Sequence, residues 1–394
     1  MSKTEIPSIR FRGFDDAWEQ RKAKELFVST ADKGYPELPV LSATQDRGMI
    51  RRDENSINIF HDKKNEAGYK RVLPGQFVIH LRSFQGGFAH SAIEGITSPA
   101  YTVFGFSEPE KHDSEYWKYV FTSKPFIQRL ETVTYGIRDG RSISYEEFLT
   151  LGFVYPSKAE QTAIARYLDK LSDLITLHQR KFEKLTNVKK SMLEKMFPQN
   201  GSCYPAVRFK GFTGPWERRK FGDVFEEYSE KNRADLPPLT IIQGSGTIRR
   251  DESERALQYD KASLSNYKVV NEGDLIVHLR SFEGGLEKAN SQGIISPAYH
   301  TFHGEGVDSR FYYTYFRSKN FIDTDLKPHV YGIRDGRSID VEGMKTIEIP
   351  FTSYPEQKLI GDAIDSINTL ISLQRRELEK LQSIKKSLLE KMFV

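Results

Sequence analysis

Arginines that stand close to glycines form three clusters in the sequence, and each cluster occurs twice. The first copy holds Arg51 with Arg52, Arg82, and Arg138 with Arg141, and the second holds Arg249 with Arg250, Arg280, and Arg334 with Arg337. The planar guanidinium of arginine can bind O6 and N7 of guanine together, or grip a phosphate. Glycine allows the backbone to approach a ligand closely. The clusters therefore predict contacts with nucleic acid.

Four further residues complete the DNA-binding candidates. Gln45 and Gln243 carry amides suited to the edge of adenine. Tyr135 and Tyr331 open the two Tyr-Gly-Ile-Arg-Asp-Gly-Arg-Ser segments that hold the last arginines of each copy.

A structural loop is the alternative, with Arg138 paired to Asp139 and Arg334 to Asp335. A structural role or a phosphate contact accounts for any single arginine better than a base contact does. Three clusters repeated in both copies nevertheless favour DNA contact by the domain as a whole, because a module that reads bases needs phosphate contacts as well as base contacts.

The sequence lacks the usual motifs of catalysis. It contains no Walker loop, no Gly-x-Gly-x-x-Gly after a strand and no Gly-x-Ser-x-Gly elbow. His80 and His278 have no second ligand at helical or turn spacing, so hydrogen-bonded histidines at strand ends are favoured over metal ligands. We expect no catalytic residues and no metal site.

Composition places further bounds on function. The net charge of +4 is only mildly basic, so DNA binding requires a local patch. The single cysteine, Cys203, excludes an intrachain disulfide and a multi-cysteine zinc site, and it fits a reducing cytoplasm. The N-terminus has no apolar signal region and no run of about 18 apolar residues occurs, so we expect a cytoplasmic protein without a membrane span.

The elements that must carry these residues are themselves repeated. His-Leu-Arg-Ser-Phe at 80–84 returns at 278–282, and the Tyr-Gly-Ile-Arg segment at 135 returns at 331. Buried strands are predicted at 75–81 and 273–279, and aromatic residues at helical spacing over 116–126 and 311–321 predict core helices. These patterns favour an α+β fold of two similar globular domains over a doubly wound sheet.

A long helix follows each globular domain, over Glu160–Phe197 and Glu356–Phe393. Apolar residues recur at steps of four and three, which is the heptad seam of a helix that packs along another helix. The two helices are therefore expected to pair as an antiparallel coiled coil with pseudo-twofold symmetry, although packing of each helix on its own globular neighbour is the alternative. The seam residues proposed are Ile164, Leu168, Leu171, Ile175, Phe182, Leu185, Ile360, Ile364, Ile367, Ile371, Leu378 and Leu381.

The whole chain resembles the specificity subunits of type I restriction–modification enzymes. The resemblance is carried by Lys-Lys-Ser-Met-Leu at 189–193 and Lys-Lys-Ser-Leu-Leu at 385–389, by the helix entries at Pro156 and Pro355, and by the Phe-Arg-Gly-Phe and Phe-Lys-Gly-Phe starts of the two halves. It implies target-recognition domains at 1–157 and 201–354, with spacer helices at 158–200 and 355–394.

The resemblance also implies a function without catalysis in this chain. Each domain would read half of a split DNA site, and the helices would set the spacer and dock two modification subunits that methylate adenine. S-adenosylmethionine, ATP and magnesium are expected on the partner subunits, and restriction subunits join in the full complex. The near-identical arginine loops predict related half-sites, tuned by the change from Asp46 to Gly244 and by divergent loops at 105–113 and 304–308.

Two other functions stay open at this point. A coiled-coil scaffold would leave the basic loops as solvated surface and would not bind DNA. A self-contained restriction or modification enzyme would need a cofactor or metal of its own.

Overall fold

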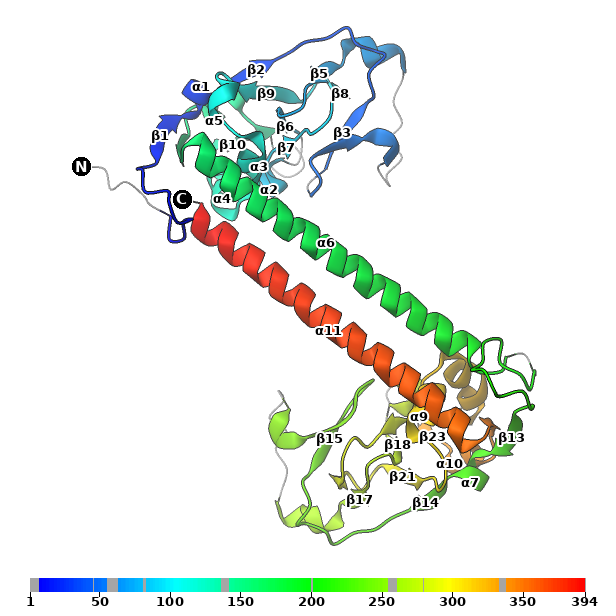
Figure 1. Ribbon diagram of the computed structural model, residues 1–394. Helices are drawn as coiled ribbons and strands as arrows, with labels where there is room; N and C mark the ends of the chain where they lie inside the picture. The colour runs from blue at the N-terminus through cyan, green and yellow to red at the C-terminus, as the bar shows by residue number, and fades with distance from the viewer. Residues whose placement is uncertain are drawn as a thin grey trace. The chain divides into compact units, whose positions relative to one another are not determined.

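The chain divides into two compact units in the computed structural model (Figure 1), which describes residues 7–44, 46–54, 63–80, 83–135, 142–199, 201–253, 261–278, 280–332 and 338–393. Unit 1 contains Met1–Gln179 and Arg376–Val394, and unit 2 contains Arg180–Arg375. Each unit holds one globular domain, the start of the long helix that follows that domain, and the end of the other long helix.

Unit 1 is built on a four-stranded antiparallel sheet in the order β2-β9-β6-β7. Its central strand β6 is buried at all three positions, which explains its continuous apolar sequence. The strands are β1 (Glu19–Lys22), β2 (Phe27–Thr30), β3 (Leu41–Ala43), β4 (Met49–Arg51), β5 (Lys70–Val72), β6 (Phe77–Ile79), β7 (Ala89–His90), β8 (Gly95–Thr97), β9 (Thr102–Phe106), β10 (Thr134–Tyr135), β11 (Ser142–Ile143) and β12 (Gly152–Tyr155).

Short helices cover this sheet and supply part of the aromatic core. The Asp113 side chain caps α3 by accepting from the Glu115 amide. Tyr116, Trp117 and Phe121 of α3 are buried, so the predicted core role of these aromatic residues is confirmed. The helices are α1 (Ala23–Leu26), α2 (Ser83–Gly86), α3 (Ser114–Thr122), α4 (Lys124–Leu130) and α5 (Tyr145–Phe148).

Unit 2 repeats this architecture, with a sheet in the order β14-β21-β18-β19. The equivalent sheet order confirms the α+β fold with two similar domains. The strands are β13 (Glu217–Lys220), β14 (Glu226–Tyr228), β15 (Leu239–Ile242), β16 (Gly246–Arg249), β17 (Lys268–Val270), β18 (Leu275–Val277), β19 (Glu287–Lys288), β20 (Gly293–Ile295), β21 (His300–His303), β22 (Val330–Tyr331), β23 (Ser338–Ile339) and β24 (Glu348–Phe351). The short helices are α7 (Phe221–Val224), α8 (Ser281–Gly284), α9 (Ser309–Phe316) and α10 (Val341–Lys345).

The two long helices are α6 (Lys158–Lys195) and α11 (Tyr354–Met392), which confirms the predicted helical stretches to within two residues. Within unit 1, the start of α6 packs into the aromatic core through Ile164 and Leu168. Met392, the last residue of α11, and Phe393, which follows it, enter the same core.

The α3 helix shows the relative direction of these two segments. At one end of α3, the Asp113 amide donates to Gln161 of α6 and Tyr116 contacts the ring of Phe393. Further along, Tyr119 donates to Asp169 of α6 and lies beneath Lys385 of α11. Residue numbers rise in α6 while they fall in α11, so the two segments run antiparallel within unit 1.

Unit 2 has the corresponding arrangement. Ile360 and Ile364 of α11 share a core with Met196 and Phe197, which follow the end of α6. Within the described part of the chain, neither long helix nor any shorter one is long and apolar enough to cross a membrane.

Candidate nucleic-acid interface

About half of the predicted DNA-binding residues have described side chains. In unit 1 these are Arg51 and Arg52, and in unit 2 they are Gln243, Arg249, Arg250, Arg280 and Tyr331. The Tyr135 side chain is outside the described set, as are all atoms of Gln45, Arg82, Arg138, Arg141, Arg334 and Arg337.

In unit 2, two predicted base readers come together at the short helix α8. Arg280 precedes this helix and has an exposed side chain. Gln243 follows β15, and its Nε2 lies so close to Gly284 of α8 that a Cβ atom at that glycine would overlap it. The amide of Gln243 therefore packs against α8 at Gly284. Gln243 and Arg280 are thus both exposed, and both lie next to α8 of unit 2.

A buried carboxylate holds the turn that follows Gln243. Glu287 of β19 is fully buried and accepts hydrogen bonds from the amides of Gly244 (2.7 Å) and Gly246 (3.1 Å). The same carboxylate accepts from the Tyr313 hydroxyl at 2.9 Å and forms an ion pair with Arg317. Burial, with the nearby charge of Glu287, raises the pKa of Tyr313 well above its usual value, so the phenol stays a donor.

His278 links the central strand of unit 2 to the arginine that follows it. Its Nδ1 accepts from the Arg280 amide at 3.2 Å, and its own amide donates to Ser281 Oγ at 2.9 Å. Burial, followed by the charges of Arg317 and Arg280, lowers the pKa of His278 to about 4. The imidazole is therefore neutral near pH 7, as an acceptor at Nδ1 requires.

The first arginine of each Arg-Arg cluster is paired to an aspartate two residues later. Arg51 lies 3.2 Å from Asp53, and Arg249 lies 3.0 Å from Asp251. Both pairs are exposed, so they contribute little stability and DNA can displace them. The pairing of Arg249 raises its pKa, and the hydrogen bond from Arg249 lowers the pKa of Asp251.

The second arginine of each cluster turns inward. The guanidinium carbon of Arg250 lies 5.3 Å from the centre of the Tyr267 ring, and its Nη1 donates to the Tyr267 hydroxyl at 3.4 Å. In unit 1, Nε and Nη1 of Arg52 are buried without a hydrogen-bond partner among the described residues. These inward positions favour a packing role over a base contact. Tyr331, by contrast, is 59% exposed on β22.

The predicted helix seam is most deeply buried where each helix meets its globular domain. The seam residues in the buried class are Ile164, Leu168, Leu171, Ile360, Ile364, Ile367 and Leu378. Those in the half-buried class are Ile175, Phe182, Leu185, Ile371 and Leu381. Pairing along the middle of the helices remains a prediction.

Sequence reasoning missed Glu287, Lys288 and Arg317. All three differ between the two copies of the repeat, since Ala89, His90 and Thr122 stand at the equivalent positions. A search for differences between the copies would have found them. In the residues that the structure describes, no three histidine, cysteine or acidic side chains cluster in the way a metal site needs.

The sequence is similar to those of two specificity subunits of type I restriction enzymes. A putative type I restriction enzyme MjaX specificity subunit of Methanocaldococcus jannaschii is 22% identical over 98% of this chain and 94% of its own length. The MjaVIII specificity subunit of the same organism is 26% identical over 59% of each chain.

The fold also resembles a crystal structure of the type I restriction-modification system S subunit from M. genitalium. That subunit is 13% identical, with a TM-score of 0.56 over 99% of both chains. No protein-family model matches the chain.

Proposed function

This chain is a specificity subunit of the type I restriction–modification kind, and on that premise we propose that each of its two units reads one half of a split DNA site. Its role is DNA recognition in a complex with other restriction–modification subunits, and it is not itself an enzyme. The observation that carries the proposal is the duplicated sheet, with a short helix after the central strand in both units.

In unit 2, we assign base reading to the surface formed by Gln243 and Arg280 at α8. A glutamine amide suits adenine, and an arginine fork suits guanine. We assign a phosphate contact to Arg249, at the end of the β15–β16 hairpin away from Gln243, and a stacking contact to the exposed Tyr331. Arg250 faces inward and packs on the ring of Tyr267, so we assign it a structural role.

We assign the docking of two modification subunits to exposed apolar positions on the long helices. These positions are equivalent in the repeat and comprise Leu174 and Leu370, Leu177 and Leu373, and Val188 and Ile384, which are between 37% and 49% exposed. A spacing of three residues places Leu174 with Leu177, and Leu370 with Leu373, on one face of its helix. Apolar side chains left in water in this way mark a protein interface.

The catalytic activities of the complex would lie in the partner subunits. The modification subunits would bind S-adenosylmethionine and methylate one adenine in each half-site, and the restriction subunits would bind ATP and magnesium. The helices would fix the spacer, so inserting about one turn, or about 5.4 Å, in each should lengthen it by one or two base pairs at about 3.4 Å per pair.

Methylation mapping tests the proposal. The chain is co-expressed with its modification subunit in a host free of adenine methylation, and the DNA is sequenced with a method that reports methyladenine. A split motif with one methylated adenine per half is expected, and its halves should be related. No methylation from an assembled complex would favour a scaffold, and methylation by this chain alone would favour a self-contained enzyme.

A further inference from the structure

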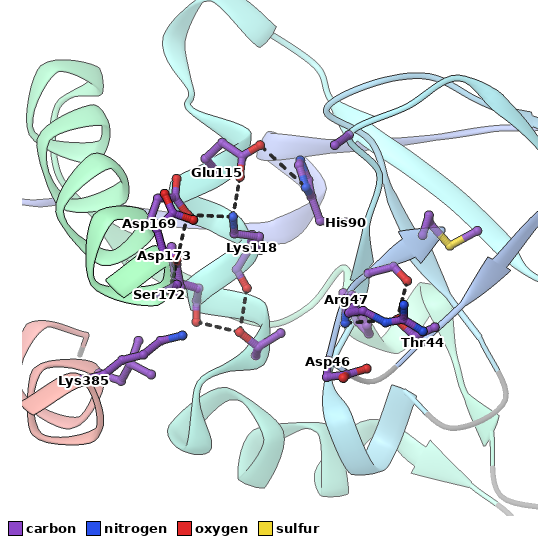
Figure 2. Close-up of a pocket in the computed structure, with 17 residues that line it drawn as sticks. Thr44, Asp46, Arg47, His90, Glu115, Lys118, Asp169, Ser172, Asp173 and Lys385 are labelled. Atoms are coloured by element: carbon purple, nitrogen blue, oxygen red, sulfur yellow. Dashed lines mark hydrogen bonds and ion pairs between the residues drawn. The ribbon is translucent and has the colours of Figure 1, made fainter. Parts of the chain in front are cut away.

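Each unit has a groove at an equivalent position, between its globular domain and the long helices. The groove of unit 1 has a volume of about 750 Å³ (Figure 2), and that of unit 2 has a volume of about 680 Å³. The groove of unit 1 is lined by residues that follow Gln45, by α3, by the start of α6 and by the end of α11. The groove of unit 2 is lined by residues that follow Gln243, by α9, by the start of α11 and by the end of α6. A ligand in either groove would therefore lie beside a base-reading turn.

The two grooves differ sharply in charge. The unit 1 lining has four acidic residues, namely Asp46, Glu115, Asp169 and Asp173, and three basic residues, namely Arg47, Lys118 and Lys385. The unit 2 lining has one acidic residue, Asp365, and five basic residues, namely Lys189, Lys288, Arg310, Arg317 and Arg375. Four replacements in the repeat account for most of this change: Asp46 by Gly244, His90 by Lys288, Glu115 by Arg310, and Thr122 by Arg317.

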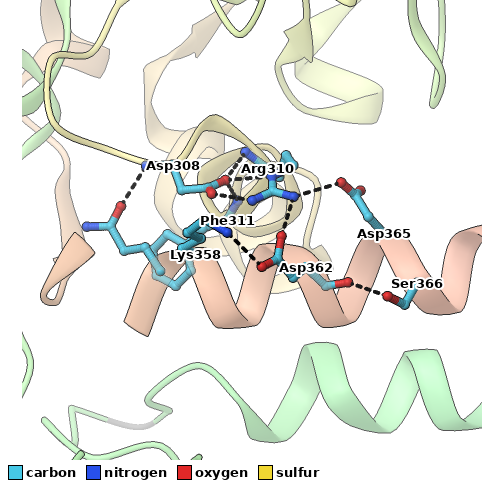
Figure 3. Close-up of polar contacts among 8 residues, drawn as sticks. Asp308, Arg310, Phe311, Lys358, Asp362, Asp365 and Ser366 are labelled. Atoms are coloured by element: carbon cyan, nitrogen blue, oxygen red, sulfur yellow. Dashed lines mark hydrogen bonds and ion pairs between the residues drawn. The ribbon is translucent and has the colours of Figure 1, made fainter. Parts of the chain in front are cut away.

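Two of the basic residues in unit 2 are neutralised by carboxylates. Arg310 forms ion pairs with Asp308 and Asp362 at 2.6 Å, and a longer one with Asp365 at 3.4 Å (Figure 3). Arg317 is paired with the buried Glu287. These contacts hold α9 against α11 and the reading turn, and they leave little charge for a ligand.

Lys189 and Lys288 are different. Neither has a carboxylate within ion-pair distance among the residues that the structure describes. Lys189 interrupts the apolar seam of α6 and is half-buried, and burial together with the charge of Arg317 lowers its pKa. A desolvated cation beside another cation is stabilised by an anionic ligand.

The equivalent lysine of unit 1, Lys385, is also desolvated beside another cation, Lys118, and its pKa is lowered in the same way, but the lining around it is acidic. Figure 2 shows Lys385 extending from α11 into a groove where Lys118 already binds Glu115 (2.5 Å) and Asp169 (2.9 Å). The ammonium of Lys385 lies over the ring of Tyr119, 5.7 Å from its centre. The acidic side chains that line this groove repel an anionic ligand.

We propose that the groove of unit 2 binds a backbone phosphate of the DNA through Lys189 and Lys288, and that the groove of unit 1 does not. This inference rests on the proposed function. It makes α6 a direct contact to the DNA backbone beside the second half-site, in addition to its role as a spacer. A lysine ammonium binds a phosphodiester as a point charge and reads no base.

The test measures DNA affinity against salt concentration for the complex with modification subunits, using duplexes with and without the site. Each lost phosphate contact lowers the log–log salt slope by about 1. Both lysines bind the same phosphate, so the double variant Lys189→Gln with Lys288→Gln should lower the slope by about 1 and weaken both duplexes by the same factor. The methylated motif should not change.

Matched variants control for folding and charge. Lys189→Arg with Lys288→Arg should keep the wild-type slope, and Lys385→Gln with His90→Gln in unit 1 should leave it unchanged. An unchanged slope in the unit 2 glutamine variant, or an equal loss in the unit 1 variant, would overturn the inference. Failure of the wild-type complex to methylate any split site would instead refute the proposed function.

Discussion

The carboxylate of Glu287 accepts a hydrogen bond from the backbone amide of Gly244 at 2.7 Å, and the described residues of unit 1 hold no equivalent of this contact. Its counterpart there is Ala89, which has no polar side chain. The corresponding turn of unit 1 is held locally instead, where Thr44 Oγ1 donates to the carbonyl of Gly48 at 2.8 Å. The turn after Gln243 and its counterpart in unit 1 therefore hold the same place in the repeat and have different supports.

Replacing Glu287 should affect the second half-site alone. Glu287→Gln places an amide NH₂ among four donors, so at least one buried donor loses its acceptor, which costs about 1–3 kcal/mol. The turn after Gln243 should loosen, and discrimination at the base that Gln243 reads should relax. Denaturant unfolding and methylation mapping give the two measurements. Glu305→Gln, at an exposed position, is the control, and a change in the first half-site would contradict the assignment.

The long helices were predictable because their signal is local and periodic. The apolar steps of four and three predicted helices over 160–197 and 356–393, and α6 and α11 begin and end within two residues of those bounds. The aromatic stretch over 116–126 was predicted as core but not as two helices. Ser123 ends α3, and its hydroxyl accepts from the Phe126 amide to begin α4.

The support of the reading turn was not predictable from local pattern. The partners of Glu287 lie 26 to 43 residues away in sequence, and only folding brings them together. An isolated glutamate in a short strand carries no periodic signal. The pairing of Arg51 with Asp53 was also missed, although the two residues are only two positions apart in the sequence.

Two buried ion pairs at the helix starts should differ in strength. Arg10 binds Glu160 in unit 1, and Arg208 binds Glu356 in unit 2, each through two hydrogen bonds of 2.6–2.8 Å to a carboxylate that is 1% exposed. Only Glu356 also accepts from an indole, that of Trp216 at 3.1 Å, and from the hydroxyl of a threonine at 2.5 Å.

Glu356→Ala should therefore destabilise its unit more than Glu160→Ala destabilises the other. Removing one partner of a buried pair costs about 3–5 kcal/mol, and the two extra donors of unit 2 add roughly 1–2 kcal/mol. Chemical unfolding followed by tryptophan fluorescence measures both variants. Equal losses, or a larger loss for Glu160→Ala, would show that the extra donors contribute nothing.

His278 should make unit 2 sensitive to acid. Its folded-state pKa of about 4 lies below the unfolded value near 6.5, so the unfolded chain binds the proton more tightly. The stability that neutral His278 contributes is therefore full above about pH 6.5 and is lost as the pH falls toward 4.

The variant His278→Asn keeps an acceptor for the Arg280 amide and removes the titration. Its free energy of unfolding should depend less on pH between 6.5 and 4 than that of the wild-type protein. Urea unfolding at a series of pH values measures the difference. If the free energy of unfolding changed with pH in the same way for both proteins, His278 would not be the source of the acid sensitivity.

Gly285 should tolerate no side chain, because it ends α8 at a close contact with another backbone segment. Its φ is +79°, and a Cβ atom there would overlap the carbonyl oxygen of Phe316. Gly285→Ala combines left-handed strain of about 1–2 kcal/mol with overpacking of about 1–3 kcal/mol, and it should also displace Arg280. Gly306→Ala is the matched control, since Gly306 has a φ of +66° with nothing within 4 Å of the added Cβ. Thermal unfolding should show a larger loss of stability for Gly285→Ala than for Gly306→Ala, and only Gly285→Ala should weaken DNA binding. Equal losses of stability would mean that the backbone at Phe316 moves to make room for the added methyl group without an energetic cost.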